Sequence, residues 1–184
     1  MAENLNFAYN EPTEDLDSSS FCYDDTTGNC LKFGRYYMWS AAMDSAGVFS
    51  DGGKGCGYGD TCNADGTVRG VCPSGWHLPS MDEWRELIFT AGGDSLVGDV
   101  LKSKIGWYRD GNGIDFYGFS ILPAGFGFDK AGFSDAFYAS FWSSTENDDE
   151  TADALYFSYD SYGVDVDDSD KDTAYSIRCV KNKN

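Results

Sequence analysis

The six cysteines restrict the possible folds of this chain more than any other feature of its sequence. Cys72 and Cys179 are the widely separated pair, and a bridge between them would tie the start of a central helix to the last strand. In the chain-entropy model such a closure restricts the unfolded ensemble by about 4 to 5 kcal/mol. The other four cysteines form two short-range pairs, Cys22 with Cys30 and Cys56 with Cys62. Six cysteines allow fifteen pairings, but the even number and this nesting favour a disulfide framework and an oxidising compartment.

Zinc ligation and free thiols are the alternatives to disulfides. The chain has a single histidine, His77, and no Cys-x-x-Cys pair, so the ligand spacing of zinc fingers is absent. Reduced structural thiols stay open as an interpretation, but we expect bridges.

Composition and charge bound the class of protein. A chain of 184 residues suits one domain with its own core. Its 12 Tyr, 13 Phe and 5 Trp beside 22 Gly indicate a loop-rich domain rather than a helical bundle, which would need more Leu and Ala. The net charge of -18 argues against nucleic acid and anionic lipid as partners and is compatible with cations such as calcium.

The sequence has no recognisable targeting signal, although its cysteines favour an oxidising compartment. No apolar run has membrane-spanning length, so no membrane insertion is expected. The first residues, 1–7, have neither a basic start nor an apolar stretch, so no signal peptide is recognisable. We nevertheless expect an extracellular or cell-surface location, reached with a leader or upstream segment that this sequence does not include, or by another route such as phage release.

Hydrophobic spacing predicts an α+β layout with short elements. Ser80 and Glu83 form a capping-box pattern ahead of Trp84, which predicts the start of a helix. The expected helices cover 35–46, Met81 to about Thr90, and Leu96 to Ser103. The expected strands cover 119–122, 140–144, 154–159, 163–166 and 175–181. Residues 8–20 are predicted to be a surface loop, and residues 47–71, with eight glycines, a bridged insertion.

Five segments resemble motifs of one known family, in the family's order and over essentially the whole chain. They are 1–7 (MAENLNF), 32–39 (KFGRYYMW), 72–80 (CPSGWHLPS), 141–146 (FWSSTE) and 176–181 (SIRCVK). On these motifs the chain resembles the Fibrobacter succinogenes major paralogous domain. That family is similar in turn to the C-type lectin-like fold and to the sulfatase-modifying (formylglycine-generating) enzymes, in which a Leu-Pro-Thr-x-x-Glu-Trp segment occupies the place held here by residues 78–84.

The resemblance implies a fold more firmly than an activity. It implies one α+β domain of C-type lectin-like type over residues 1–184, with two to three short helices packed on short antiparallel strands. In the family the motif at 1–6 usually follows a strand and a Trp, so the opening strand is expected to be missing or supplied differently. Members are bacterial and generally secreted or surface-attached, often as modules of larger proteins. The expected bridges are Cys22–Cys30, Cys56–Cys62 and Cys72–Cys179.

Enzymatic chemistry finds little support in the sequence, and we expect no enzyme. His77 would have to carry any imidazole mechanism, yet it lies just before the capped helix with no nucleophile near it, which favours a structural role. An oxidase of the formylglycine-generating kind needs two reduced cysteines, whereas these cysteines look paired. Nothing marks two of the 31 acidic residues as a glycosidase pair.

A calcium site is the one cofactor that the sequence leaves open. Glu146, Asn147 and Asp148 offer clustered oxygen ligands of the kind that calcium prefers. The Glu-Pro-Asn and Trp-Asn-Asp motifs of calcium-dependent lectins are absent, and the alternative is a solvated acidic rim.

The C-terminal hairpins are the predicted ligand-binding surface, because they combine tyrosine rings with short polar side chains, as antibody paratopes do. The candidate residues are Trp142, Tyr156, Tyr159, Tyr162, Asp165, Asp167 and Tyr175. We therefore expect a recognition or adhesion module for carbohydrate or a cell-surface protein, with a monomer favoured. The alternatives are an assembly subunit of a surface or phage structure, and a ligand-binding protein diversified by a retroelement.

Overall fold

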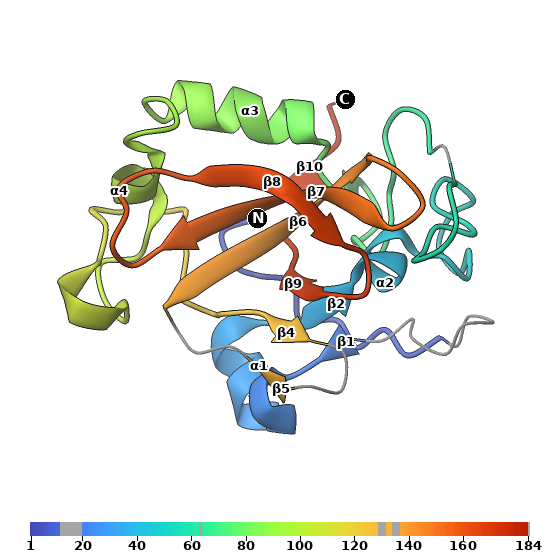
Figure 1. The fold of residues 1–184 in the computed structure, drawn as a ribbon, viewed down its shortest axis with the longest axis horizontal. Coiled ribbons are helices and arrows are strands. Elements are labelled where there is room, and N and C mark those ends of the chain that lie inside the picture. Colours follow the sequence, from blue (N-terminus) through green and yellow to red (C-terminus); the bar gives the residue numbers. More distant parts are fainter. Residues whose placement is uncertain (12–19, 63, 129–131, 134–136, 184) are drawn as a thin grey trace.

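The computed structural model of the chain, drawn in Figure 1, has few short helices and is otherwise mostly sheet and loop. It describes residues 1–11, 20–62, 64–128, 132–133 and 137–183. The α+β prediction is confirmed. In chain order the elements are β1 (Ser20–Phe21), η1 (Tyr23–Asp25), α1 (Thr27–Phe33), β2 (Tyr36–Met38), α2 (Trp39–Met43), β3 (Trp76–His77), α3 (Met81–Thr90), α4 (Val97–Leu101), η2 (Tyr108–Asp110), β4 (Gly127–Phe128), β5 (Gly132–Phe133), β6 (Tyr138–Glu146), β7 (Thr151–Ser158), β8 (Asp165–Asp170), β9 (Ala174–Ser176) and β10 (Val180–Lys181).

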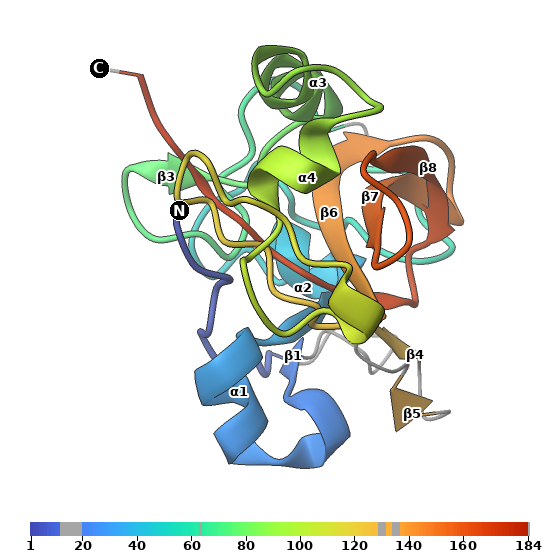
Figure 2. The ribbon, with the colours of Figure 1, turned by 90° about the vertical axis from the view of Figure 1, so that its left-hand side faces the viewer.

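The main sheet has the strand order β1-β2-β9-β6-β7-β8, with β4 and β5 attached beside β9. Strands β6, β7 and β8 form an antiparallel meander, and β6 is parallel to β9. A separate pair joins β3 to β10, with His77 opposite Val180. Strand β8 is therefore one end of the main sheet, as Figure 2 shows from the side.

Two hydrophobic cores lie on opposite faces of the meander, because side chains alternate along each strand. Trp142 and Ala154 belong to the core that includes α2 and the loop after it. Phe141 and Leu155, their neighbours in sequence, belong to the core that includes α3 and α4. The sheet is therefore covered on both faces, and its helices are too few to cover the outer strand β8.

Helix α3 confirms the capping-box prediction. The Ser80 hydroxyl accepts a hydrogen bond from the Glu83 N–H, and the Glu83 carboxylate accepts one from the Ser80 N–H. Met81, Trp84 and Ile88 then follow one another along the buried face. The predicted third helix is also present as α4.

The predicted helix over 35–46 is largely wrong. Tyr36 to Met38 form strand β2, which pairs with β9 far away in the sequence, and only Trp39 to Met43 are helical. The apolar spacing looked helical because nearly every side chain of this segment is buried, so the pattern reports burial and not helix periodicity. The helix ends at Asp44, whose left-handed φ of 62° breaks it before the predicted glycine stop.

Other boundaries differ in smaller ways. Residues 119–122 are not a strand; Ile121 makes one isolated bridge to Lys102. The expected last strand is divided into β9 and β10. Helix α1 was not predicted. Within 47–71 the described residues have no helix or strand beyond one isolated bridge, as expected, and most of the predicted loop at 8–20 lies outside the described residues.

All three predicted disulfides are present: Cys22–Cys30, Cys56–Cys62 and Cys72–Cys179. The last joins residues 107 positions apart and ties the loop before β3 to the segment between β9 and β10. Among the described residues, none of the helices has the length and apolar content to cross a lipid bilayer.

Candidate ligand-binding surface

The hairpin of β7 and β8 presents its outer strand to the solvent. All six residues of β8 are exposed or half-buried, whereas the residues of its partner β7 are alternately buried and half-buried for most of its length. Tyr156 lies opposite Asp165, and Ala154 lies opposite Asp167, so Asp165 and Asp167 share one face of the sheet with Tyr156. Three of the predicted ligand-binding residues therefore come together.

Tyr175 supports this group from β9, which is separated from β7 by β6. Its hydroxyl lies 3.3 Å from the Tyr156 hydroxyl and 2.7 Å from the Ser169 hydroxyl. Burial raises the pKa of both tyrosines, because the charged phenolate loses hydration there. Tyr175 itself is almost fully buried, so it positions Tyr156 and offers little surface of its own.

Trp142, predicted to be part of the ligand-binding surface, lies in the core instead. Its side chain is fully buried, and the indole N–H donates to the Tyr37 carbonyl oxygen over 2.8 Å. Its ring packs against Tyr175, with 4.5 Å between centroids. The polar atom of a buried indole needs such a partner, and the ring here fills the core beneath the hairpin. Trp142 therefore has no face left for a ligand.

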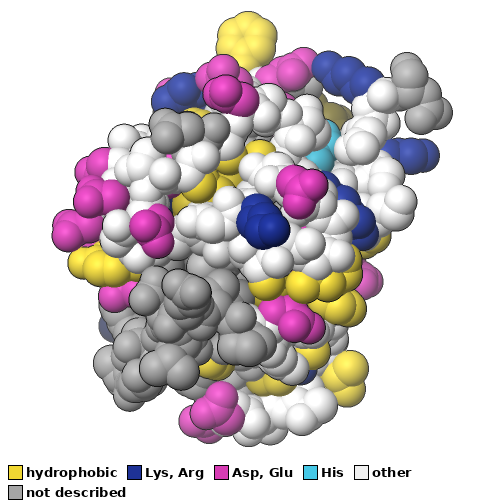
Figure 3. Space-filling model, turned by 90° about the vertical axis from the view of Figure 1, so that its right-hand side faces the viewer, with side chains coloured by type: hydrophobic (Ala, Val, Ile, Leu, Met, Phe, Trp, Pro, Cys, Tyr) yellow, Lys and Arg dark blue, Asp and Glu magenta, His cyan; other side chains and the backbone are white. Residues whose placement is uncertain are grey.

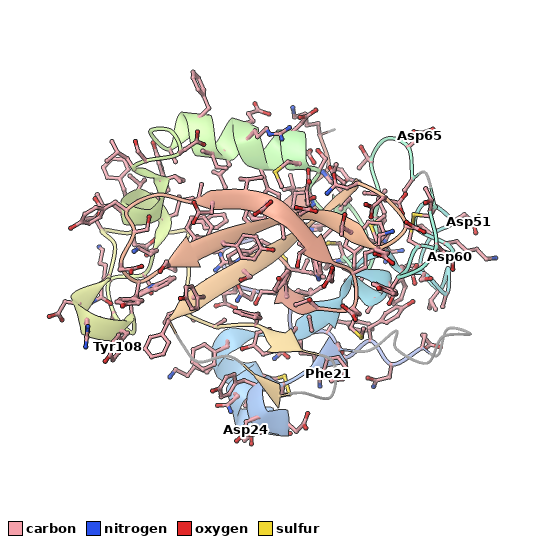
Figure 4. All side chains as sticks on the ribbon, in the orientation of Figure 1. Phe21, Asp24, Asp51, Asp60, Asp65 and Tyr108 are labelled. Carbon is pink, nitrogen blue, oxygen red and sulfur yellow. A yellow bond between two sulfur atoms is a disulfide. The ribbon has the colours of Figure 1, made fainter. Side chains whose placement is uncertain are left out.

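A cluster of three rings surrounds the turn between β7 and β8. Tyr108 packs edge-on against Phe137 and Tyr159, with centroid distances of 4.6 Å and 5.3 Å. Figure 4 shows Tyr108 at the end of the molecule opposite Asp51, Asp60 and Asp65. Tyr162, within the same turn, is 68% exposed. The sequence indicated Tyr159 and Tyr162 but missed Tyr108 and Phe137, since only the fold brings them to this turn.

Lys102 holds that turn from inside. The lysine is buried, and its ammonium donates to the Ser158 and Ser161 carbonyl oxygens over 3.1 Å and 2.8 Å. It also lies over the Trp107 ring. Burial lowers the pKa of Lys102, and the nearby Asp99 and Asp160 carboxylates offset part of this effect.

Lys171 holds the other turn, between β6 and β7. Its ammonium donates to the Glu146 carboxylate over 2.7 Å and to the Asp148 carbonyl oxygen over 2.6 Å. Asp60 and Asp149 contribute further carbonyl oxygens at 2.9 Å and 3.3 Å. The Lys171 side chain is fully buried and that of Glu146 nearly so. The ammonium thus occupies a cage of oxygen atoms.

The residues predicted to bind calcium have three different environments. Glu146 faces Lys171, Asn147 donates through its amide to Asp153, and the Asp148 carboxylate accepts N–H bonds that close its own turn. In the described part of the chain, no group of three or more His, Cys, Asp or Glu side chains is placed to hold a metal ion. The acidic side chains on the face in Figure 3 are spread over its surface. Calcium binding stays a prediction without a geometric site.

His77 has polar partners on both sides of its ring. Its Nδ1 lies 2.7 Å from Asn182 Oδ1, and its Nε2 lies 2.9 Å from the Glu83 carboxylate. Burial acts to raise the pKa of Glu83, but the Ser80 N–H and the His77 ring outweigh it and hold that pKa below its usual value. His77 thus links the capped helix to the C-terminal segment, which fits the predicted structural role.

Comparison with known families assigns the chain to one of them. The family described as the Fibrobacter succinogenes major domain matches residues 1–181. The chain belongs to this family. The resemblance of the five sequence motifs is thereby confirmed for the Fibrobacter succinogenes major domain. No curated protein and no solved structure shows a significant match to the chain.

Proposed function

We propose that this protein is a non-enzymatic recognition module, extracellular or displayed on a cell surface, that binds carbohydrate or another cell-surface ligand through the β7–β8 hairpin. One observation carries the proposal. Tyrosine rings and exposed carboxylates lie together at a hairpin that packs on buried core residues. Such a surface offers contact area and hydrogen bonds at a low cost in conformational entropy.

The rings lie at the turn end of the hairpin, two from the turn itself and one from η2. Tyr108, Tyr159 and Tyr162 present flat, amphipathic faces on which a sugar ring can stack. Asp165 and Asp167 follow on β8 and can accept hydrogen bonds from sugar hydroxyls. Because Lys102 ties the turn to the interior, the rings are held before a ligand arrives.

The finer features of the proposal rest on the family resemblance. We infer a C-type lectin-like arrangement of the elements, in which the C-terminal hairpins form the recognition surface. Calcium, if it takes part, would assist through carboxylates near the β6–β7 turn.

A glycan panel tests the proposal directly. The oxidised protein is screened against polysaccharides and glycans, once with calcium and once with chelator. For a glycan that binds, Tyr162→Ala and Tyr108→Ala should each weaken binding about tenfold or more, since stacking area is lost. Tyr58→Ala is the matched control, because Tyr58 is comparably exposed but lies outside the hairpin. If both ring variants bind like the unchanged protein, the site lies elsewhere.

An assembly subunit is the second candidate, favoured by the segment before β4. Ile105, Phe116 and Tyr117 are large apolar side chains that are mostly exposed. Exposed apolar groups of this kind mark protein interfaces. A folded protein that binds no glycan and whose mass in light scattering rises with concentration would support assembly over carbohydrate recognition.

A further inference from the structure

The free edge of β8 borders a groove that shares only Asp165 and Asp167 with the proposed carbohydrate surface. β8 pairs with β7 on one side and is the end of the main sheet on the other (Figure 2). Between the start of β8 and α3 lies an open groove of about 750 Å³. Its lining combines apolar residues, Ile88, Phe89 and Val166, with charged ones, Arg85, Asp165 and Asp167.

The backbone of β8 shows which groups face this edge. The Lys171 N–H donates to the Glu150 carbonyl oxygen, whereas the Asp168 N–H donates to the Asp167 side chain. Hydrogen-bonding direction alternates along an antiparallel strand, so the odd-numbered residues of β8 bond to β7 and the even-numbered ones point outward. The Val164 N–H is already bonded to the Asp94 carbonyl oxygen. The N–H and C=O of Val166 therefore face the open edge beside the groove.

The α3 side of the groove offers the apolar side chains Ile88 and Phe89 beside Arg85. Val166 pairs with Leu155, whose side chain packs in the core with α3, so Val166 lies on the α3 face of the sheet. Phe89, near the end of α3, is 84% exposed, and Val166 is 37% exposed. An aromatic ring left this open beside a strand edge offers area for an apolar side chain of a partner.

The other face of the edge is acidic. Asp165 and Asp167 lie there, whereas Asp168, two residues after Val166, lies on the α3 face opposite Asp153 of β7 and is not among the residues that line the groove. Like charges at a sheet edge repel a similar strand, so two copies of this chain would not pair through β8. The groove's one cation, Arg85, is already paired with Asp82. A strand that carries lysine or arginine would meet attraction instead of repulsion.

We propose that the β8 edge binds an extended, basic segment of another protein, which adds to the sheet as a further strand. Because side chains alternate across a strand, its apolar residues would enter the groove toward Phe89 and its basic residues would lie on the side of Asp165 and Asp167. The recognised pattern is therefore an alternation of apolar and basic residues. This inference goes beyond the proposed carbohydrate function and does not depend on it.

Three synthetic octapeptides test the proposal by fluorescence anisotropy at physiological salt. The first alternates Val and Lys, the second alternates Val and Glu, and the third is the Val–Lys peptide with every second amide N-methylated. The Val–Lys peptide should bind at least tenfold more tightly than either control, since the second reverses the charge and the third cannot complete a ladder. Equal binding of the N-methylated peptide would overturn strand addition, and so would equal binding of the Val–Glu peptide.

Protein variants locate the site. Val166→Pro removes an outward N–H without touching the bonds to β7, a place where a sheet tolerates proline. This variant, Phe89→Ser and the pair Asp165→Asn/Asp167→Asn should each weaken binding of the Val–Lys peptide about fivefold or more.

The matched controls are Leu31→Ser, 80% exposed on α1, and Asp51→Asn/Asp65→Asn at the far end of the molecule (Figure 4). If the control pair weakens binding as much as the β8 pair, the attraction is general charge and the proposal fails. If Val166→Pro does not fold, binding of the N-methylated peptide to the unchanged protein decides whether a strand is added. The glycan screen is independent, so either proposal can fail alone.

Discussion

The two turns of the β6–β7–β8 meander lie at opposite ends of the sheet, and each is held by one buried lysine (Figure 1). The surroundings of the two ammonium groups differ. Lys171 faces a carboxylate at 2.7 Å, whereas both oxygens that accept from Lys102 are backbone carbonyls. At the β6–β7 turn two buried charges of opposite sign are paired. At the β7–β8 turn backbone carbonyl oxygens accept from the ammonium, and the Asp99 and Asp160 carboxylates act on it without a direct ion pair.

The difference shows two ways in which an acidic protein can keep a cation inside. A paired charge is stable only while both partners are present, because either one alone would be buried without compensation. A charge held by carbonyl oxygens leaves no opposite charge behind when it is removed, but its own ionisation is weakened, as the lowered pKa of Lys102 reflects. The two turns should therefore respond differently to the same substitution.

The largest effect is expected for Lys171→Met. It leaves the Glu146 carboxylate nearly buried without its cation, which should lower the free energy of unfolding by about 3 to 5 kcal/mol. Urea unfolding measures this, with exposed Lys54→Met as the control. The double variant Lys171→Met/Glu146→Gln should recover part of the loss; no recovery would mean that the orphaned charge is not the cause.

A smaller loss is expected for Lys102→Met. The Ser158 and Ser161 carbonyl oxygens lose their donor, but no charge is stranded, so the decrease should be about 1 to 3 kcal/mol. The same unfolding experiment with exposed Lys104→Met as its neighbour control measures it. A loss as large as that of Lys171→Met would erase the distinction between the two turns.

Chemical rescue separates the turns in another way. Lys171→Ala should open a cage with one carboxylate and three carbonyl oxygens, into which propylammonium can bind and raise the melting temperature by several degrees. Lys102→Ala lacks the carboxylate and should respond less. Tetramethylammonium, which cannot donate hydrogen bonds, is the control salt. A parallel experiment with calcium tests whether the emptied cage binds a metal ion. Equal rescue of the two variants by propylammonium would contradict the proposed difference between the two turns.

The pH dependence is the smallest expected difference. The pKa of Lys102 is lowered from its ordinary value of 10.5, so between the two values the unfolded state binds more protons than the folded state. The contribution of this residue to the free energy of unfolding then rises with pH in that interval. The destabilisation caused by Lys102→Met should accordingly grow between about pH 8 and about pH 10. Urea unfolding of both lysine variants at the two pH values measures it; a flat difference for Lys102→Met would contradict the assignment.

The parts of the fold that sequence predicted are those with local or covalent signals. The capping box of α3 lies within four residues, and the disulfide pairs follow from cysteine spacing and the family motifs. The error at 35–46 has the opposite origin. Tyr36 to Met38 are extended because β9, about 140 residues later, pairs with them, and no local pattern carries that information.

The candidate surface was predictable in its residue types and not in its geometry. The tyrosine-rich hairpin was recognisable from composition, but alternation along β6 turns Trp142 inward, where it becomes core. The two lysines that hold the turns gave no signal at all. A buried lysine looks like any other lysine until the fold shows which carbonyl oxygens surround it.

The two ends of the chain are fastened to each other. The Met1 ammonium donates to the Cys179 carbonyl oxygen, the Leu5 N–H donates to the Ile177 carbonyl oxygen, and Cys179 is bridged to Cys72. In Figure 2 the N label lies on the side of the molecule away from β8, and the last described residues run along that same side. Attachment to a sensor chip through either terminus would therefore leave the β8 edge on the far side from the attachment point, where injected peptides can reach it.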